Sequence, residues 1–400
     1  MQKDKIFGLE KNVFYTGLTS FFTDTSTKMV YSVMPLFLLS IGASKTTISL
    51  IEGIAESTAS LLKALSGFWS DKIGKNKPFM IIGYGITAII TPFYAAVVTP
   101  FQVLYLRFIE RVGKGLRTAP RDSLISGSIK NNDAGRNFGF HKAMDNSGAI
   151  LGPLLAFLLL YLFPLNYGYI FLLATIPAII GVITIIVLIK EAHAGHPPEK
   201  STLSLKHLPR RYWFFLAVIF VFSLGNSTDA LLLVKTSETG IKSSYIPLIY
   251  MIFNLVSVLF AIPAGKLSDK FGREKLIILG FLIYSVVYFF FGKYKNINIF
   301  LFLFILYGLY SALTDSSQKA MISDIVSKDL KGTGYGLYHA VLGITLLPAS
   351  LIAGILYDKV NSDAPFYFGA VMALLATILM IFFAFGFKIK KQTTLTTTLL

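Results

Sequence analysis

Long apolar runs alternate with short polar segments along the whole chain. About 12 of these runs are long enough to cross the hydrocarbon core of a bilayer, roughly 30 Å thick, as helices that rise about 1.5 Å per residue. The predicted helices lie near residues 13–40, 45–66, 77–99, 102–126, 138–163, 167–189, 212–234, 243–264, 275–293, 297–322, 333–357 and 364–387. The pattern predicts an all-α polytopic membrane protein with twelve transmembrane helices.

Two polar motifs occur once in each half of the chain. The loop GFWSDKIGKNK after the second predicted helix returns as GKLSDKFGREK after the eighth. AGRNFGFHKA, at the start of the fifth helix, resembles KGTGYGLYHA at the start of the eleventh, at nearly the same offset. Such a repeat indicates a duplicated transporter with a binding site between two related bundles. We expect pseudo-symmetric six-helix bundles at residues 1–189 and 212–400, the second ending in a short cytoplasmic tail.

A polar stretch over residues 190–211, KEAHAGHPPEKSTLSLKHLPRR, separates the two predicted bundles. Its Pro pair and charges are typical of a linker, which we place in the cytoplasm. It contains His193, His196 and His207, so a metal-binding tract is one interpretation. A solvated linker is favoured because no complete ligand set accompanies these histidines. We therefore expect no metal and no other cofactor.

Composition and charge agree with a membrane protein. Apolar residues make up 54% of the chain and charged residues 14%, and the absence of cysteine excludes disulfides and thiolate sites. The net charge of +16 would suit nucleic acid, but Lys and Arg in the predicted loops concentrate on one side. Only six loop lysines fall on the other side: Lys45, Lys235, Lys242, Lys293, Lys295 and Lys359. The positive-inside rule then places both termini in the cytoplasm of a cell-membrane protein with no nucleic-acid partner. The polar start MQKDKIFGLEKN predicts no cleavable signal.

The repeated loop has a defined set of residues. They are Gly67, Asp71, Lys72, Gly74 and Lys75 in the first copy, and Gly265, Asp269, Gly272 and Arg273 in the second. Gly67 permits close helix approach and Gly74 a tight turn. Asp71 falls at a helix end, where a carboxylate can accept backbone and Arg hydrogen bonds. A purely topological basic turn would require neither the Asp nor the recurring glycines.

Two further motifs lie within helices. The fourth predicted helix contains RVGKGLRTA (111–119), and the fifth contains Gly139, Gly148, Gly152 and Pro153. Together with the loop motif, they make the whole chain resemble the major facilitator superfamily. Lys114 and Arg117 replace a Gln and a Gly of the family's fourth-helix pattern. Ala156 and Phe157 replace a glycine pair in the fifth.

The resemblance implies roles for these motifs. In the family, the loop is a latch that stabilises one access state. The fifth-helix spacing is associated with bacterial proton-coupled antiporters. Even in that interpretation its residues are structural, because Gly148 and Gly152 form a small-residue face and Pro153 bends the helix. Plain helix packing is the alternative.

Charged side chains also lie inside the predicted helices, mostly in the first half. A charge in the membrane costs several kcal/mol unless it is paired or hydrated, so these groups should face inward. Spacing of about 100° per residue places them on single helix faces. The candidate substrate and proton pathway is Asp24, Glu52, Glu56, Arg111, Lys114, Arg117, His141, Asp145, Asn226, Asp229 and Asp315. Structural ion pairs are the alternative, especially for Arg107, Arg121, Asp122 and Lys63.

Specific contacts follow from the resemblance and the duplication. The first and fourth helices adjoin in this fold, so we expect Asp24 to pair with Arg111. Asp24, Glu56 and Asp145 are candidate proton carriers, and His141 either titrates near neutral pH or is buried and hydrogen-bonded. By duplication, Asn226 and Asp229 would face Asp24 across a cavity. An aromatic wall or a packed core would be formed by Tyr250, Phe253, Tyr307 and Tyr310.

These observations predict a secondary transporter that works by alternating access. We expect proton-coupled efflux of a small amphipathic or ionic solute by a monomer in the lipid bilayer, since no P-loop is present. The basic fourth helix favours an alternative, which is uptake or export of an anionic metabolite or metal chelate. An enzyme is disfavoured because the chain lacks a nucleophile–base spacing, HExxH or a Cys motif. A membrane scaffold would not require a charged interior.

Overall fold

The computed structural model covers residues 1–400, and the structure is described for residues 5–128, 134–191, 208–327 and 330–396. A short hairpin of β1 (Lys5–Ile6) and β2 (Leu9–Glu10) precedes the helices. These are α1 (Lys11–Ser40), α2 (Lys45–Ile73), α3 (Lys77–Phe93), α4 (Pro100–Ser128), α5 (Ala134–Leu162), α6 (Tyr167–Leu188), α7 (Arg210–Gly225), α8 (Asp229–Ser237), α9 (Ile246–Phe271), α10 (Arg273–Lys293), α11 (Ile297–Ile325), α12 (Lys331–Lys359) and α13 (Ala364–Thr396), with 3-10 turns at Tyr94–Ala96 and Ser243–Tyr245. The predicted all-α polytopic membrane fold is confirmed.

The helices differ in how apolar they are. Within the described residues, 9 helical segments are long and apolar enough to cross a membrane by length and composition. The other three long helices, α1, α2 and α4, carry most of the embedded charges of the first half. Their lower hydropathy therefore marks the helices that face a polar interior.

The seventh predicted helix is broken, which corrects the single helix expected over residues 212–234. α7 ends at Gly225, and α8 begins at Asp229 after a three-residue gap. The Thr228 hydroxyl caps α8 by accepting the Ala230 N–H at 3.2 Å. The break has a local cause, because Asn, Ser and Thr side chains compete for backbone hydrogen bonds and favour helix ends.

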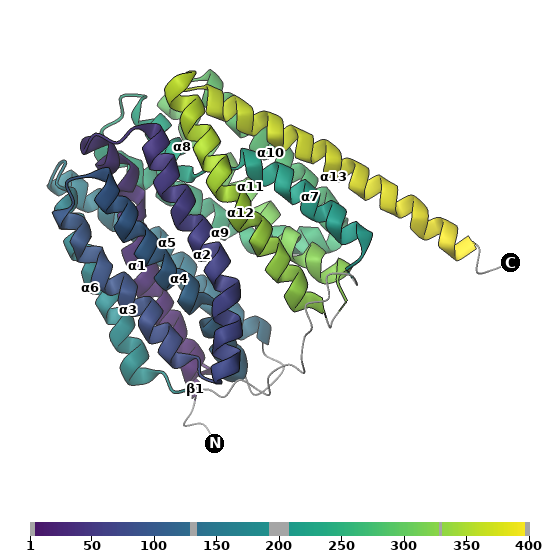
Figure 1. Ribbon diagram of the computed structural model, residues 1–400, viewed down its shortest axis with the longest axis horizontal. Coiled ribbons are helices and arrows are strands. Elements are labelled where there is room, and N and C mark those ends of the chain that lie inside the picture. The colour runs from purple at the N-terminus through teal and green to yellow at the C-terminus, as the bar shows by residue number, and fades with distance from the viewer. Residues whose placement is uncertain (1–4, 129–133, 192–207, 328–329, 397–400) are drawn as a thin grey trace.

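Two groups of helices make up the molecule. Helix α1 packs on α5 and α6, and α4 packs between α2 and α3; in the second group α10 packs on α11 and α13, and α9 on α11. Figure 1 shows the first group on one side and α10 to α13 on the other. The groups meet where α2 packs on α12 and α5 on α9. The division of the chain at 190–211, with its histidines, stays a prediction because residues 192–207 lie outside the described part.

At one end of the helix bundle, the start of α1 and the start of α3 are hydrogen-bonded to the segment that follows α6. Near the N-terminus, the Asn12 side chain exchanges two hydrogen bonds of 3.0 Å with the Lys190 backbone. Close by, the Glu191 carboxylate accepts the N–H groups of Asn76 and Lys77 at 2.9 and 3.1 Å. We call this end the N-terminal face and the other the opposite face.

Small residues line the contact between α2 and α12, which we call the α2–α12 seam. A Cβ placed on Gly354 would lie 2.7 Å from the Thr46 Cα. A Cβ on Gly53 would lie 3.0 Å from the Ser350 Cβ, and one on Gly343 would lie 3.1 Å from Ser60. Glycine thus allows the two halves to touch along much of α2.

A carboxylate closes the seam at the opposite face. Asp358, near the end of α12, accepts the backbone N–H groups of Lys45 and Thr46 at 3.3 and 2.7 Å. The first N–H groups of a helix have no hydrogen-bond partner within that helix, so the Asp358 carboxylate supplies acceptors for two of them at the start of α2. These two hydrogen bonds therefore link α2 of the first group of helices to α12 of the second.

Asp358→Ala is expected to favour separation of α2 and α12 on the opposite face. Capping bonds of this kind contribute about 0.5–2 kcal/mol, equivalent to roughly a 2- to 30-fold shift in a two-state ratio. The chain has no native cysteine, so nitroxide labels can be placed at Ser40→Cys and Val360→Cys. Pulsed electron resonance would then report the distance between the end of α1, which leads into α2, and the end of α12. The control is Lys359→Ala on the same helix end. An unchanged distance distribution in Asp358→Ala would contradict the capping role.

Candidate functional site

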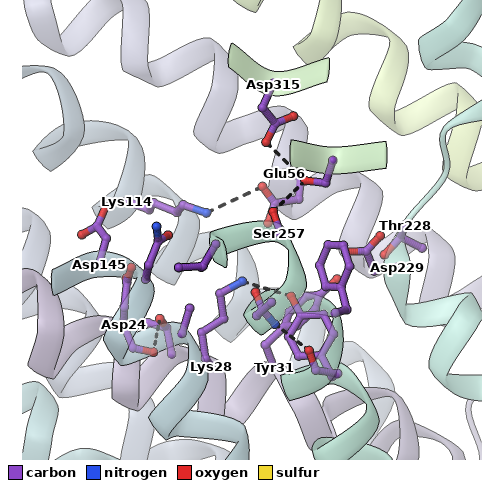
Figure 2. Close-up of a pocket in the computed structure, with 18 of the residues that line it drawn as sticks. Asp24, Lys28, Tyr31, Glu56, Lys114, Asp145, Thr228, Asp229, Ser257 and Asp315 are labelled. Carbon is purple, nitrogen blue, oxygen red and sulfur yellow. Dashed lines mark hydrogen bonds and ion pairs between the residues drawn. The ribbon is translucent and has the colours of Figure 1, made fainter. Parts of the chain in front are cut away.

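A cavity of about 580 Å³ lies between the two groups of helices. Its walls come from α1, α2, α4 and α5 on one side, and from the α7–α8 break, α9 and α11 on the other. The charged lining residues are Asp24, Lys28, Glu56, Glu110, Arg111, Lys114, Arg117, Arg121, Lys142, Asp145, Asp229 and Asp315. Figure 2 shows Asp24 and Asp145 on one side of it, Asp229 on the other, and Lys28 between them.

Glu56 joins two cations of α4. Its carboxylate lies 3.0 Å from Arg111 and 3.8 Å from Lys114. The expected pair between Asp24 and Arg111 is therefore wrong for this structure. The reason is packing: α4 lies along α2 over most of its length and touches α1 much less, so Arg111 reaches the α2 carboxylate.

Asp24 and Lys28 are the charged residues of α1 that face the cavity. Neither has an oppositely charged group within 4.0 Å in the described part of the chain. The Lys28 ammonium instead donates a 3.0 Å hydrogen bond to the Tyr250 hydroxyl of α9. It also lies 5.2 Å from the Tyr250 ring centroid and 5.5 Å from that of Tyr31. This contact crosses from one half of the molecule to the other.

A second ionic group lies at the α4–α5 side of the cavity. Asp145 lies 3.8 Å from Arg121 and 4.0 Å from His141. Arg121 also bonds Asp122 at 2.9 Å, as expected of a structural pair. His141 lies outside the cavity lining, where its buried ring is 2.9 Å from the Ser20 hydroxyl. Of the two interpretations of His141, the structure has the buried, hydrogen-bonded one.

Glu52 also lies outside the cavity lining, although the sequence groups it with the pathway residues. Arg107 donates to it through Nε at 3.0 Å and through a second nitrogen. Arg107 also bonds Glu110 at 3.0 Å, and Tyr94 donates to Glu110 at 2.8 Å. Glu52 and Arg107 are each only 1% exposed. This cluster is a buried ion-pair network in which Glu110 lines the cavity, while Glu52 and Arg107 lie behind its wall.

The second half contributes carboxylates among aromatic rings. Tyr307 donates a 2.7 Å hydrogen bond to Asp229, in the first turn of α8. The rings of Tyr307 and Phe253 stack with centroids 4.9 Å apart. Asn226 bonds the Tyr310 hydroxyl at 3.4 Å, and Asp315 accepts from Ser311 at 3.4 Å. All four residues of the predicted aromatic wall line the cavity.

Some lining residues were not among the sequence candidates. Lys28 and Arg121 are embedded charges, while Ser227 and Thr228 belong to the helix break. The signal for the break was the Asn-Ser-Thr triplet inside an apolar run. Ser257, on α9, bonds Ser311 at 3.2 Å and carries no comparable signal.

The two loop motifs lie away from the cavity. Gly74 ends α2 with a φ of 69°, which confirms the tight turn. The surroundings of Gly67 and the Asp71 side chain lie outside what the structure describes, and Lys72 and Lys75 are exposed. In the second copy, Arg273 bonds Asp269, and it also bonds Asp324 of α11 at 3.3 Å. That copy therefore ties together α9, α10 and α11.

The fifth-helix glycines pack against α1. A Cβ on Gly152 would lie 2.5 Å from the Thr25 carbonyl oxygen, and one on Gly148 would collide with that of Phe21. Gly139 has open space around it. Two of the three glycines thus allow close backbone approach.

Comparisons with known proteins agree with this architecture. A family model described as Major Facilitator Superfamily matches residues 16–236 and 214–396. An uncharacterized MFS-type transporter of Methanocaldococcus jannaschii is 33% identical over 383 residues, covering 94% of this chain and 95% of that protein. Multidrug resistance protein 1 of Bacillus subtilis is 32% identical over 134 residues, 33% of this chain and 34% of that protein.

A solved structure shares the fold. The crystal structure of a POT family transporter in complex with 5-aminolevulinic acid superposes with a TM-score of 0.82. The match covers 95% of this chain and 97% of that chain at 12% sequence identity. At this identity, the likeness concerns the arrangement of helices alone.

Proposed function

The chain belongs to the major facilitator superfamily and is a membrane transporter, and from this premise we propose that it exports a small amphipathic or ionic solute in exchange for protons by alternating access. Uptake or export of an anionic metabolite or metal chelate is the competing transport function. The partial relative named as a multidrug resistance protein favours export.

The observation that carries the proposal is the charged cavity between the two halves. It holds ionisable groups at the place where superfamily members bind their solutes. Such groups are costly in a membrane and usually mark a transport or proton pathway. Their concentration in a 580 Å³ space between the halves supports coupled transport more than passive packing.

Among the cavity carboxylates of the first half, Asp24 is the one best placed to carry a proton. Glu56 already has two basic partners, Arg111 and Lys114. Asp145 has Arg121 and His141 nearby. Asp24 has no basic group within 4.0 Å in the described residues and faces the cavity. A proton there would change the charge of the cavity without first breaking an ion pair.

The orientation belongs to the same proposal. We place the N-terminal face in the cytoplasm of a multi-pass cell-membrane protein, with both termini inside and the transporter acting as a monomer. The Asp358 bonds hold the opposite face together. With this orientation, the proposal takes the structure as an inward-facing state.

Asp24→Asn is expected to reduce solute-driven proton movement at least about tenfold, because an amide cannot take up a proton at neutral pH. Purified protein in liposomes with an internal pH dye would be given a proton gradient and a panel of cationic drugs, organic anions, metal chelates and zwitterions. The matched control is Glu10→Gln, which removes a carboxylate outside the cavity. Wild-type activity in Asp24→Asn would remove Asp24 from the pathway. No solute response by folded wild-type protein would contradict proton coupling.

A further inference from the structure

We propose that the transported solute is a zwitterion whose protonated amine is bound by the Asp229 wall and whose acid group is bound by Arg117 and Lys114. This inference rests on the proposed transport function and specifies its substrate class. It follows from the placement of Arg117 and Lys114 on one wall of the cavity and of Asp229 and Asp315 on the other.

The second-half wall is suited to an ammonium group. Asp229 and Asp315 have no basic nitrogen within 4.0 Å in the described residues. The contact of Asp229 is with the Tyr307 hydroxyl at 2.7 Å, and the stacked rings of Tyr307 and Phe253 line the same cavity. A carboxylate beside aromatic faces attracts cations through both charge and ring quadrupoles.

Lys28 shows that this region accepts an ammonium. Its Nζ reaches across from α1, bonds the Tyr250 hydroxyl at 3.0 Å, and lies over the Tyr250 and Tyr31 rings. Tyr250 in turn contacts Phe253, with ring centroids 5.7 Å apart, so Lys28 occupies one end of the aromatic wall. A solute amine would occupy the neighbouring space beside Asp229.

The first-half wall carries positive charge at Arg117 and Lys114, next to the carboxylates of Asp24 and Glu56. Arg117 lines the cavity, is 5% exposed, and has no carboxylate within 4.0 Å in the described part of the chain. It donates to the Thr87 hydroxyl at 2.7 Å and lies 4.3 Å from the Tyr84 ring centroid. Lys114 is 3.8 Å from Glu56, and its side chain is 44% exposed. Arg117 and Lys114 together provide the donors that a carboxylate or phosphonate would accept from.

When the cavity closes around a solute, the charges on its two walls favour a zwitterion over a simple cation or anion. When water is expelled, each wall charge that lacks a partner becomes costly. An organic cation would neutralise the acidic wall and leave Arg117 unpaired, and an organic anion would leave Asp229 unpaired. A solute with both groups satisfies both walls in one step. The 580 Å³ cavity is large enough for a drug-sized molecule, so amino acids and dipeptides would fit.

The test measures binding without any ion gradient, so it is separate from the test of proton coupling. Purified protein would be titrated with matched series built on phenylalanine, alanylphenylalanine and an aminoalkyl phosphonate. Each series has a zwitterion, an amine with a blocked acid, an acid with an acetylated amine, and a doubly blocked form. Calorimetry should show the zwitterion of at least one series binding tenfold or more tightly than its three blocked forms.

Two variants test which wall of the cavity binds the amine of the solute and which binds its acid group. Asp229→Asn should remove the preference for a free amine while keeping that for a free acid, and Lys114→Gln should do the reverse. Asp315→Asn is the second acidic-wall variant if Asp229→Asn does not fold. Equal binding of the zwitterion and one singly blocked form would overturn the proposal in favour of a simple cation or anion. Absence of binding by every zwitterion would overturn it as well.

Discussion

Glu52→Ala is expected to destabilise the protein by about 3–5 kcal/mol, the usual cost of leaving a buried charge without its partner. Glu52 and Arg107 are each 1% exposed, and Arg107 loses two hydrogen bonds when the carboxylate is removed. The remaining partner, Glu110, is also bonded to Tyr94 and cannot replace the second contact.

Thermal and denaturant unfolding of the purified protein would measure the loss. Glu10→Ala is the matched control, because the Lys5–Glu10 pair is 3.9 Å long and the Lys5 side chain is 42% exposed. Exposed pairs of that kind contribute about 0–1 kcal/mol. Equal unfolding midpoints for the two variants would show that Glu52 is not part of a buried network.

Gly152→Ala and Gly139→Ala are expected to change stability in opposite directions. A Cβ on Gly152 would lie 2.5 Å from the Thr25 carbonyl oxygen and 2.9 Å from the Met29 nitrogen, so α1 and α5 would have to separate. Overpacking of this kind costs about 1–3 kcal/mol. A Cβ on Gly139 would meet no described atom outside its own stretch of helix within 4 Å, and alanine improves helix propensity by up to about 1 kcal/mol.

The same unfolding assay distinguishes the two glycines of the motif, and transport provides a second readout. Gly139→Ala should keep full transport, while Gly152→Ala should lose folded protein and transport together. If both variants were equally stable, the close approach of α1 and α5 would be refuted. The fifth-helix motif would then require a role other than packing.

Hydropathy accounts directly for nine of the spanning segments in the described part of the chain, while embedded charges lower it in α1, α2 and α4. It failed at residues 226–228, where a continuous apolar run contains a short polar triplet and the helix stops. A window that averages over about twenty residues does not register three polar positions. The only sequence signal for the helix break was the Asn-Ser-Thr triplet, whose side chains compete with the helix for backbone hydrogen bonds.

The candidate site was predicted in its composition more than in its contacts. Helical spacing indicates which charges share a face, and Asp24, Glu56 and Asp145 all reach the cavity. Spacing along one helix does not fix the rotation of α4 against α2, so Arg111 was paired with Asp24 instead of Glu56. The same limit applies to Glu52, whose helix face continues past the cavity into the α2–α4 contact.

The α2–α12 seam contains buried polar groups that weaken the contact between the two helices. Ser49 and Ser350 lie within it, and their buried hydroxyls have no hydrogen-bond partner among the described residues. Each such hydroxyl costs about 1–3 kcal/mol when closed off from water, a cost that hydration relieves when the seam parts. This cost opposes the gain from the Asp358 bonds at the end of the seam. The closed seam is therefore less stable than the Asp358 bonds alone would make it.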